Sequence, residues 1–218
     1  PLEPAPELTE EQILSSDHIV GQMGVEPFMN ALDLGCDLIL AGRAYDPAVF
    51  AALPVKLGYD RGLALHLGKI LECAAICASP GSGSDCMYGT LGEDWFELEA
   101  LSPKRICTTT SVAAHTLYEK SNPYLLPGPG GMLDLRECSF TDVGGGKVRV
   151  KGSKFVPSPS YTIKLEGAHC IGYRTVSIAG TRDPIMIREI DHIVEAVKER
   201  VADNFRDEKW DYHLNFIL

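Results

Sequence analysis

LALHLGKILECAAICA, residues 63–78, is apolar on almost every side, and this pattern predicts a helix buried inside a fold. His66, Lys69 and Glu72 interrupt the apolar run at every third position. These three side chains follow a slowly rotating stripe along the helix, so they form either its single solvated face or part of a polar pocket. Of the two alternatives, we favour the solvated face.

The residues before this helix predict a β-α-β unit with a right-handed crossover. DHIVGQMG (17–24) is typical of a short strand, VEPFMNAL (25–32) of a helix and DLILAG (37–42) of a buried strand. A second helix is expected to begin at Asp46-Pro47, with the aspartate as its N-cap and the proline at its first position.

The second half of the chain has a different residue pattern. SVAAHTLYEK predicts a helix that begins at the hydroxyl run 108–111. Over residues 132–179 short strands alternate with glycine turns, including a hairpin around residues 144–146, and a long amphipathic helix is expected from Pro184 to about Phe205. The expected fold class is α/β, with a parallel or mixed sheet built from β-α-β units and a Gly-rich antiparallel meander in the second half.

The expected domain organisation is a linker-like N-terminal segment, residues 1–16, followed by a single α/β domain. That domain is expected to comprise an α/β part (17–131), a β-rich part (132–182) and a closing helix and strand (183–218). The chain starts at Pro1 and stops inside DYHLNFIL, which is typical of an unfinished strand. We therefore expect a piece of a longer parent chain, with missing flanking segments as partners and marginal stability or aggregation by itself.

Charge and composition narrow the classes of partner. The formal net charge of -10 disfavours nucleic acid, because phosphate binding needs a basic surface, and it disfavours anionic membranes as well. No run of about 18 apolar residues is present, and PLEPAPELTEEQ has neither the positive nor the apolar region of a secretory signal. A cytoplasmic protein without a membrane partner is expected.

The cysteines are expected to be reduced thiols. There are seven of them, an odd number without a close-spaced framework. Zinc and iron–sulfur clusters need closely spaced thiolates, whereas Cys77 follows Cys73 by four residues and Cys86 follows nine later. No metal is expected.

CASPGSGSDC, residues 77–86, leaves two alternatives once a metal is set aside. A strict phosphate-binding loop precedes a helix, whereas this loop follows one. The favoured interpretation is a flexible turn. The other is a ligand-facing loop, in which Gly81, Ser82 and Gly83 bind an anion and Asp85 handles protons.

LILAGRAYDPAVF (38–50) carries the sharpest signal for a ligand. Arg43 stands one residue past the end of the expected strand, and ligands of open α/β sheets bind outside the carboxyl ends of strands. A guanidinium there can bind a carboxylate or phosphate bidentately. Alternatively, Arg43 only pairs with Asp46, which is both the expected helix cap and a candidate catalytic carboxylate.

Two further features are candidates for chemistry. His115 and Glu119 are four residues apart on one helix face, so they form either an oriented acid/base pair or an exposed polar pair. The loop Pro127–Gly131 needs unusual backbone angles and allows close approach to a ligand, which makes Gly130 a candidate binding residue.

VSIAGTRDPIMI (176–187) repeats the pattern of residues 38–50. Each is an apolar strand followed by Ala-Gly, an arginine and an Asp-Pro that begins a helix. A guanidinium beside a helix N-terminus suits an anion. We expect the strands 38–42 and 175–180 to run parallel in one sheet, with Arg43 and Arg182 lining one crevice at its carboxyl edge.

Six segments, in order, resemble the core of the acyclic terpene utilisation AtuA family: GRAYDPAVFAA, GKILECAAICASPGSGSD, TSVAAHTLYEKSNPYLLPGPGGMLDL, KLEGA, GYRT and AGTRDP. The resemblance runs from about Val20 to Phe205. It implies a longer parent chain and a role in bacterial catabolism of branched, unsaturated acids, beside acyl-CoA enzymes. Ala74 stands where many members have glycine. The resemblance supplies no catalytic residue.

Two functions follow from these observations. The first is an enzyme that acts on an anionic carboxylate or acyl-CoA thioester by acid/base chemistry of the lyase, hydratase or isomerase type, with CoA only as part of the substrate. The second is a non-catalytic subunit or binding module of a catabolic acyl-CoA assembly. Homo-oligomerisation is open for either. Candidate side chains gathered in one pocket favour the enzyme, and scattered ones favour the module.

Overall fold

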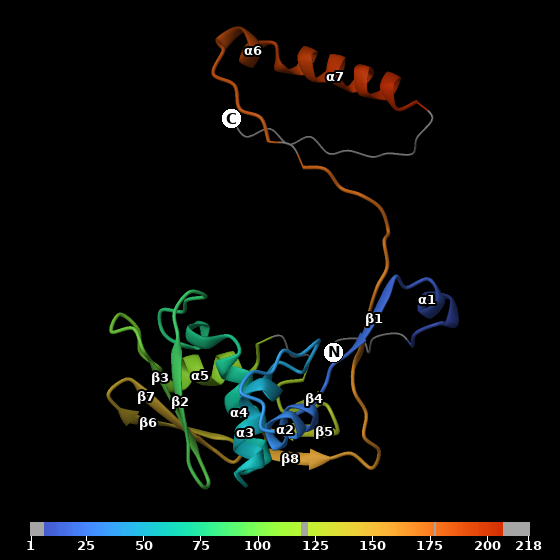
Figure 1. The fold of residues 1–218 in the computed structure, drawn as a ribbon. Coiled ribbons are helices and arrows are strands. Elements are labelled where there is room, and N and C mark those ends of the chain that lie inside the picture. Colours follow the sequence, from blue (N-terminus) through green and yellow to red (C-terminus); the bar gives the residue numbers. More distant parts are fainter. Residues whose placement is uncertain (1–6, 119–121, 177, 207–218) are drawn as a thin grey trace. The chain divides into compact units, whose positions relative to one another are not determined.

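A computed structural model describes residues 7–118, 122–176 and 178–206 (Figure 1). The chain divides into two compact units, residues 1–170 (unit 1) and 171–218 (unit 2). The first six residues of the expected linker, Glu119 and the expected closing strand in DYHLNFIL lie outside the described residues.

Helix α4, Arg61–Leu71, is the central helix of unit 1 (Figure 1). It begins at Asp60, whose side chain accepts a hydrogen bond from the Leu63 N–H. Every residue from Gly62 to Ile70 is buried, including His66 and Lys69. The predicted solvated face is therefore wrong, and the stripe of polar side chains lies inside the protein.

Helix α3, Pro47–Lys56, packs directly on α4. A Cβ atom at Gly68 would lie 2.6 Å from the carbonyl oxygen of Pro47, so the two backbones touch where α3 begins. This contact fixes the start of α3 against the last turn of α4.

The predicted helix over 63–78 ends earlier than expected. After α4 the chain turns at Cys73 and forms a short 3-10 helix, Ala74–Cys77. Ala74 has φ +47°, and it is the only non-glycine residue with positive φ among those described. This conformation favours glycine, because an L side chain there crowds the following carbonyl oxygen.

The remaining helices of unit 1 are short. They are α1 (Glu10–Leu14), α2 (Glu26–Asp33) and α5 (Thr109–Thr116). The predicted start of α5 is confirmed, because Thr108 and Ser111 form a reciprocal capping box. Helix α1, with its own capping box, lies in the expected linker-like segment.

The strands form three antiparallel sheets. The first has two strands, β1 (His18–Gly21) and β9 (Leu165–Ala168). The second has four, in the order β2 (Met87–Leu91), β3 (Phe96–Ala100), β7 (Lys147–Lys151) and β6 (Ser139–Gly144). The third has three, in the order β4 (Leu125–Gly128), β5 (Gly131–Asp134) and β8 (Lys154–Pro157). The hairpin at residues 144–146 confirms the predicted glycine turn. The described residues form no continuous Gly-rich meander, because the strands between 131 and 168 are divided among three sheets.

The predicted parallel sheet of β-α-β units is not formed by the described residues. Within them, the parallel pairing is a single bridge between Met23 and Ala44. Residues 37–42 form no strand, and Leu38 and Leu40 are 85% and 98% exposed. The parallel hydrogen bonds are made after this stretch, from the Met23 N–H to the Arg43 carbonyl and from the Tyr45 N–H to the Met23 carbonyl, while β1 pairs with β9. The observed fold is mixed α/β with antiparallel sheets.

Two hydrophobic cores lie on opposite sides of α4. The first includes Ala64 and Leu65 and lies against α2, α3 and the β4-β5-β8 sheet. The second includes Leu63, Leu67 and Ile70 and lies against the four-stranded sheet and α5. Because α4 contributes to both cores, its rotation about its own axis decides which side chains face each of them.

His66 connects these elements through a buried chain of hydrogen bonds. The Thr116 hydroxyl donates to the Val112 carbonyl, so it accepts from Nε2–H of His66 at 3.0 Å. Nδ1 therefore carries no proton and accepts from the Ser153 hydroxyl at 2.7 Å. The Cys138 thiol lies 3.5 Å from Ser153 Oγ and can donate to it, since burial raises the pKa of that thiol.

Unit 2 contains helices α6, Pro184–Arg188, and α7, Ile190–Asn204, which confirm the predicted helical segment with a break at Glu189. The Asp183 carboxylate caps α6 by accepting from the N–H groups of Ile185 and Met186. The described residues of 175–180 form no strand.

We expect His66 to make the stability of the protein depend on pH. Burial lowers the pKa of His66 from its ordinary 6.5 to about 3, so the unfolded chain binds a proton below pH 6.5 that the folded protein does not. The free energy of unfolding should fall as the pH is lowered from 6.5 towards 5, by up to about 1.4 kcal/mol per pH unit. Urea unfolding at a series of pH values measures this slope. H66Q should lose this part of the slope, and an equal slope in H66Q would contradict the assignment.

We expect Ala74→Gly to stabilise the protein by about 1 kcal/mol, because it relieves the left-handed conformation. Urea unfolding at pH 7 measures the change. Ala114→Gly is the matched control, since Ala114 lies inside helix α5, where glycine should cost about 1 kcal/mol instead. A loss of stability in both variants would show that Ala74 is unstrained.

Candidate functional site

A cleft of about 450 Å³ in unit 1 is the largest of the pockets described for this protein. It is lined by the segment after β1, the start of α3, the end of α4, the β4–β5 turn and the segment before β9. Its lining residues are Gln22, Arg43, Tyr45, Asp46, Pro47, Lys69, Glu72, Pro127, Gly128, Pro129, Thr162, Ile163 and Lys164.

A nearly buried ion pair lines the cleft at the end of α4. Lys69 Nζ donates to Glu72 Oε1, and their side chains are only 2% and 11% exposed. The ammonium also lies 5.8 Å from the centre of the Tyr118 ring, within the range of a cation–π contact. Burying one charge without a partner costs several kcal/mol, so each of these two side chains depends on the other.

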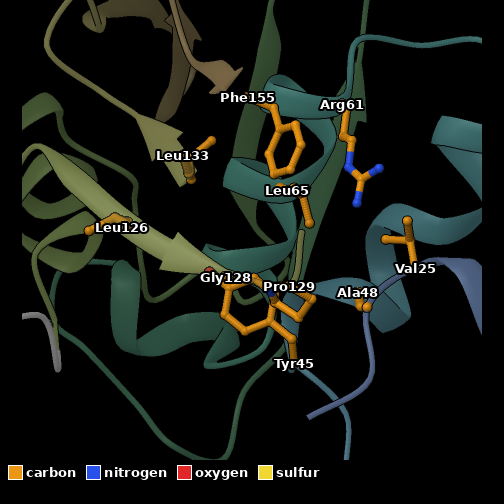
Figure 2. A pocket seen from close by; sticks show the side chains of 11 residues that line it. Val25, Tyr45, Ala48, Arg61, Leu65, Leu126, Gly128, Pro129, Leu133 and Phe155 are labelled. Atoms are coloured by element: carbon orange, nitrogen blue, oxygen red, sulfur yellow. The ribbon is translucent and has the colours of Figure 1, made fainter. Parts of the chain in front are cut away.

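Tyr45 presents a neutral hydroxyl beside this pair. Burial, together with the negative charges of Glu72 and Asp46, raises the pKa of Tyr45 to about 12. Its ring packs against the β4–β5 turn, where a Cβ atom on Gly128 would come within 3.0 Å of it. Figure 2 shows Tyr45 beside Gly128 and Pro129, at a second cavity of only about 10 Å³.

Arg43 lies at the polar rim of the cleft. Its Nε and Nη2 donate to Oε2 and Oε1 of Glu166 at 2.8 and 3.3 Å, and its Nη1 donates to Asp46 at 2.8 Å. These contacts confirm the predicted pairing with Asp46 and add a partner from β9. Asp46 was also expected to cap α3, but its side chain makes no capping hydrogen bond because it faces Arg43.

The loop at residues 77–86 is closed by Arg105, which the sequence did not suggest. The Arg105 guanidinium donates to the Asp85 carboxylate and to the carbonyl oxygens of Pro80 and Gly81. The N–H of Ser82 donates to the Ala75 carbonyl. These contacts support the turn, and neither this loop nor Asp85 lines the cleft.

His115 and Gly130 do not line the cleft either. His115 is buried and stacks on Tyr118, with ring centres 5.4 Å apart, so the exposed-pair alternative is wrong for it. Gly130 has φ +73° in the β4–β5 turn and packs on Tyr161. Arg182 belongs to unit 2, and the crevice shared with Arg43 stays a prediction whose supporting strands are not formed in the described residues.

Sequence reasoning missed part of the cleft. Tyr45, Gln22 and Lys164 carried no recognisable signal, because the cleft is completed by segments far apart in the chain. The signal for Lys69 and Glu72 was present: opposite charges three residues apart within an otherwise apolar helix.

Metal binding has no described site. In the ranges that the structure covers, no three His, Cys, Asp or Glu side chains gather closely enough to hold an ion. All seven cysteines lie in those ranges as free thiols. No helix within these ranges combines the length and the apolar character needed to span a membrane.

Comparison with known proteins gives one match. A family model described as "Acyclic terpene utilisation family protein AtuA" matches residues 101–216, just over half of the chain. This region includes the β4–β5 turn and Lys164 of the cleft, whereas Arg43, Lys69 and Glu72 precede it. No curated protein and no solved structure matches.

We expect Lys69→Met to destabilise the protein by about 3–5 kcal/mol, because it leaves the Glu72 carboxylate nearly buried without its cation. The double variant K69M/E72Q should lose at least about 1 kcal/mol less than the two single variants together. Urea unfolding of the four proteins measures this coupling. Additive losses would show that the two charges do not depend on each other.

Proposed function

We propose that this chain, which belongs to the acyclic terpene utilisation family AtuA, binds a branched carboxylate or the acyl end of a CoA thioester in the cleft and transfers a proton there. The family places the chain in the context of acyclic terpene utilisation. The observation that carries the rest is the nearly buried Lys69–Glu72 pair in a cleft that also contains Arg43.

The cleft offers separate places for the two ends of such a substrate. Arg43 and Lys164 supply cationic donors at the rim, which suit a carboxylate. Pro47, Pro127 and Ile163 supply apolar surface for a branched chain. A volume of about 450 Å³ suits a small acid, and ligand pockets range from about 300 to 1,000 Å³, so of an acyl-CoA only the acyl end would enter.

Lys69, Glu72 and Tyr45 are the groups for proton transfer. A Glu72 carboxylate can accept a proton from a carbon next to a carbonyl group, and the Lys69 ammonium can stabilise the negative charge that develops on the carbonyl oxygen. The neutral Tyr45 hydroxyl can donate a hydrogen bond to the same oxygen. This arrangement suits a lyase, hydratase or isomerase.

The alternative is a non-catalytic binding module of an acyl-CoA assembly. It is favoured by the positions of Asp85 and His115, which do not line the cleft with Arg43 and Asp46. The two functions differ in one respect: a module binds its ligand without exchanging the ligand's protons with solvent.

The experiment is binding and proton exchange with 3-methylbutanoate and 3-methylbutanoyl-CoA, whose protons on the carbon next to the thioester carbonyl are acidic. We expect wild-type protein to bind by calorimetry, and to exchange acidic C–H protons of the thioester for deuterium in heavy water, followed by NMR. Arg43→Met should weaken carboxylate binding at least about tenfold, as expected for the loss of a charged hydrogen-bond partner.

Glu72→Gln tests the proton transfer. It should abolish exchange and keep binding, because it preserves the shape of the side chain and removes the base. Since it also leaves Lys69 without its carboxylate, circular dichroism first establishes that E72Q is folded. Lys147→Met is the matched control for Arg43→Met, since it also removes a paired cation. Lys147 pairs with Glu99 on the four-stranded sheet and does not line the cleft. Binding without exchange in wild type would support the module, and no binding of either compound would contradict the proposal.

A further inference from the structure

We propose that the Glu166 carboxylate occupies the place of the substrate's carboxylate and competes with it for Arg43. This inference rests on the proposed function and adds an internal competitor to it. Glu166 would thus set how readily the cleft accepts anionic ligands.

The contacts of Glu166 are those expected of a bound carboxylate. Arg43 donates from Nε to Oε2 and from Nη2 to Oε1, which is the two-pronged geometry by which arginine binds carboxylates. Gln22 Nε2 donates to Oε1 at 2.9 Å, and Lys164 Nζ lies 3.1 Å from Oε1. Hydrogen bonds from Arg43 and Lys164 lower the pKa of Glu166 to about 2, so it is ionised at neutral pH.

The donors belong to the cleft, whereas Glu166 does not line it. Arg43, Gln22 and Lys164 are all lining residues. They come from three different segments, and they converge on one carboxylate. A ligand carboxylate that entered the cleft would meet the same three side chains, and it could bind them only after Glu166 had turned away.

Displacement of Glu166 is physically easy. The side chains of Arg43 and Glu166 are 36% and 30% exposed, and ion pairs that are open to water contribute little to stability. The Glu166 backbone is held in the β1–β9 ladder opposite Val20. The side chain can therefore rotate into solvent while the strand pairing is kept.

The competition has a measurable consequence. A ligand whose site is open for only a fraction of the time binds with an affinity reduced by that fraction. Removing the competing charge should therefore tighten the binding of a carboxylate, by about fivefold if Glu166 holds Arg43 for about four-fifths of the time. A neutral ligand of the same shape should gain nothing.

The experiment compares Glu166→Gln with wild type by calorimetry, using 3-methylbutanoate and its neutral amide as probes. We expect E166Q to bind the carboxylate about fivefold more tightly and the amide with unchanged affinity. Adding R43M to E166Q should abolish the gain. Glu97→Gln is the matched control: Glu97 accepts from Nε and Nη2 of Arg149 on β7, and it should leave carboxylate affinity unchanged.

The outcomes separate this inference from the proposed function. If wild type binds the carboxylate and E166Q binds it equally or more weakly, the proposed competition is wrong and the proposed function is unaffected. If neither protein binds the carboxylate, both fail. Glu166→Ala repeats the comparison if E166Q does not fold, as judged by circular dichroism, and it should show the same gain.

Discussion

The packing of unit 1 depends on the two buried hydrogen bonds of the His66 imidazole. A polar ring without exposure to solvent is tolerated only when both nitrogens have partners, and here they come from α5 and from the segment between β7 and β8. That requirement fixes the rotation of α4. Each step of three residues turns the stripe by about 60°, so a stripe that begins at His66 in the interior reaches the cleft by Glu72. The hydrogen bonds of His66 thus set the rotation of α4, and this rotation directs the Lys69–Glu72 pair to the cleft.

Elements with local signals could be predicted from the sequence. The starts of α3 and α5 follow from proline and hydroxyl caps, and the β6–β7 hairpin follows from three consecutive glycines with positive φ. Each of these signals acts within a few residues and needs no knowledge of the rest of the fold. The resemblance to the AtuA family also came from contiguous segments, and the match over residues 101–216 confirms it.

Features that depend on distant neighbours could not be predicted. The apolar run at 37–42 has the composition of a strand, but composition does not say whether another strand is free to pair with it. Likewise, charged side chains in an apolar helix are compatible with solvent or with a pocket, and only the packing of α3 and the β4–β5 turn around Lys69 decides between them. The arginine of the cleft was recognised, whereas its Glu166 partner lies 123 residues away.

The contact between Gly68 and Pro47 has a consequence for the rigidity of the cleft. Pro47 begins the helix that follows Arg43, and Gly68 directly precedes Lys69, so the backbone contact joins the two charged ends of the cleft through rigid elements. Neither helix can slide along the other without a clash of backbone atoms. The start of α3 and the end of α4 therefore move together, so the two walls of the cleft that carry Asp46 and Lys69 keep a constant backbone separation.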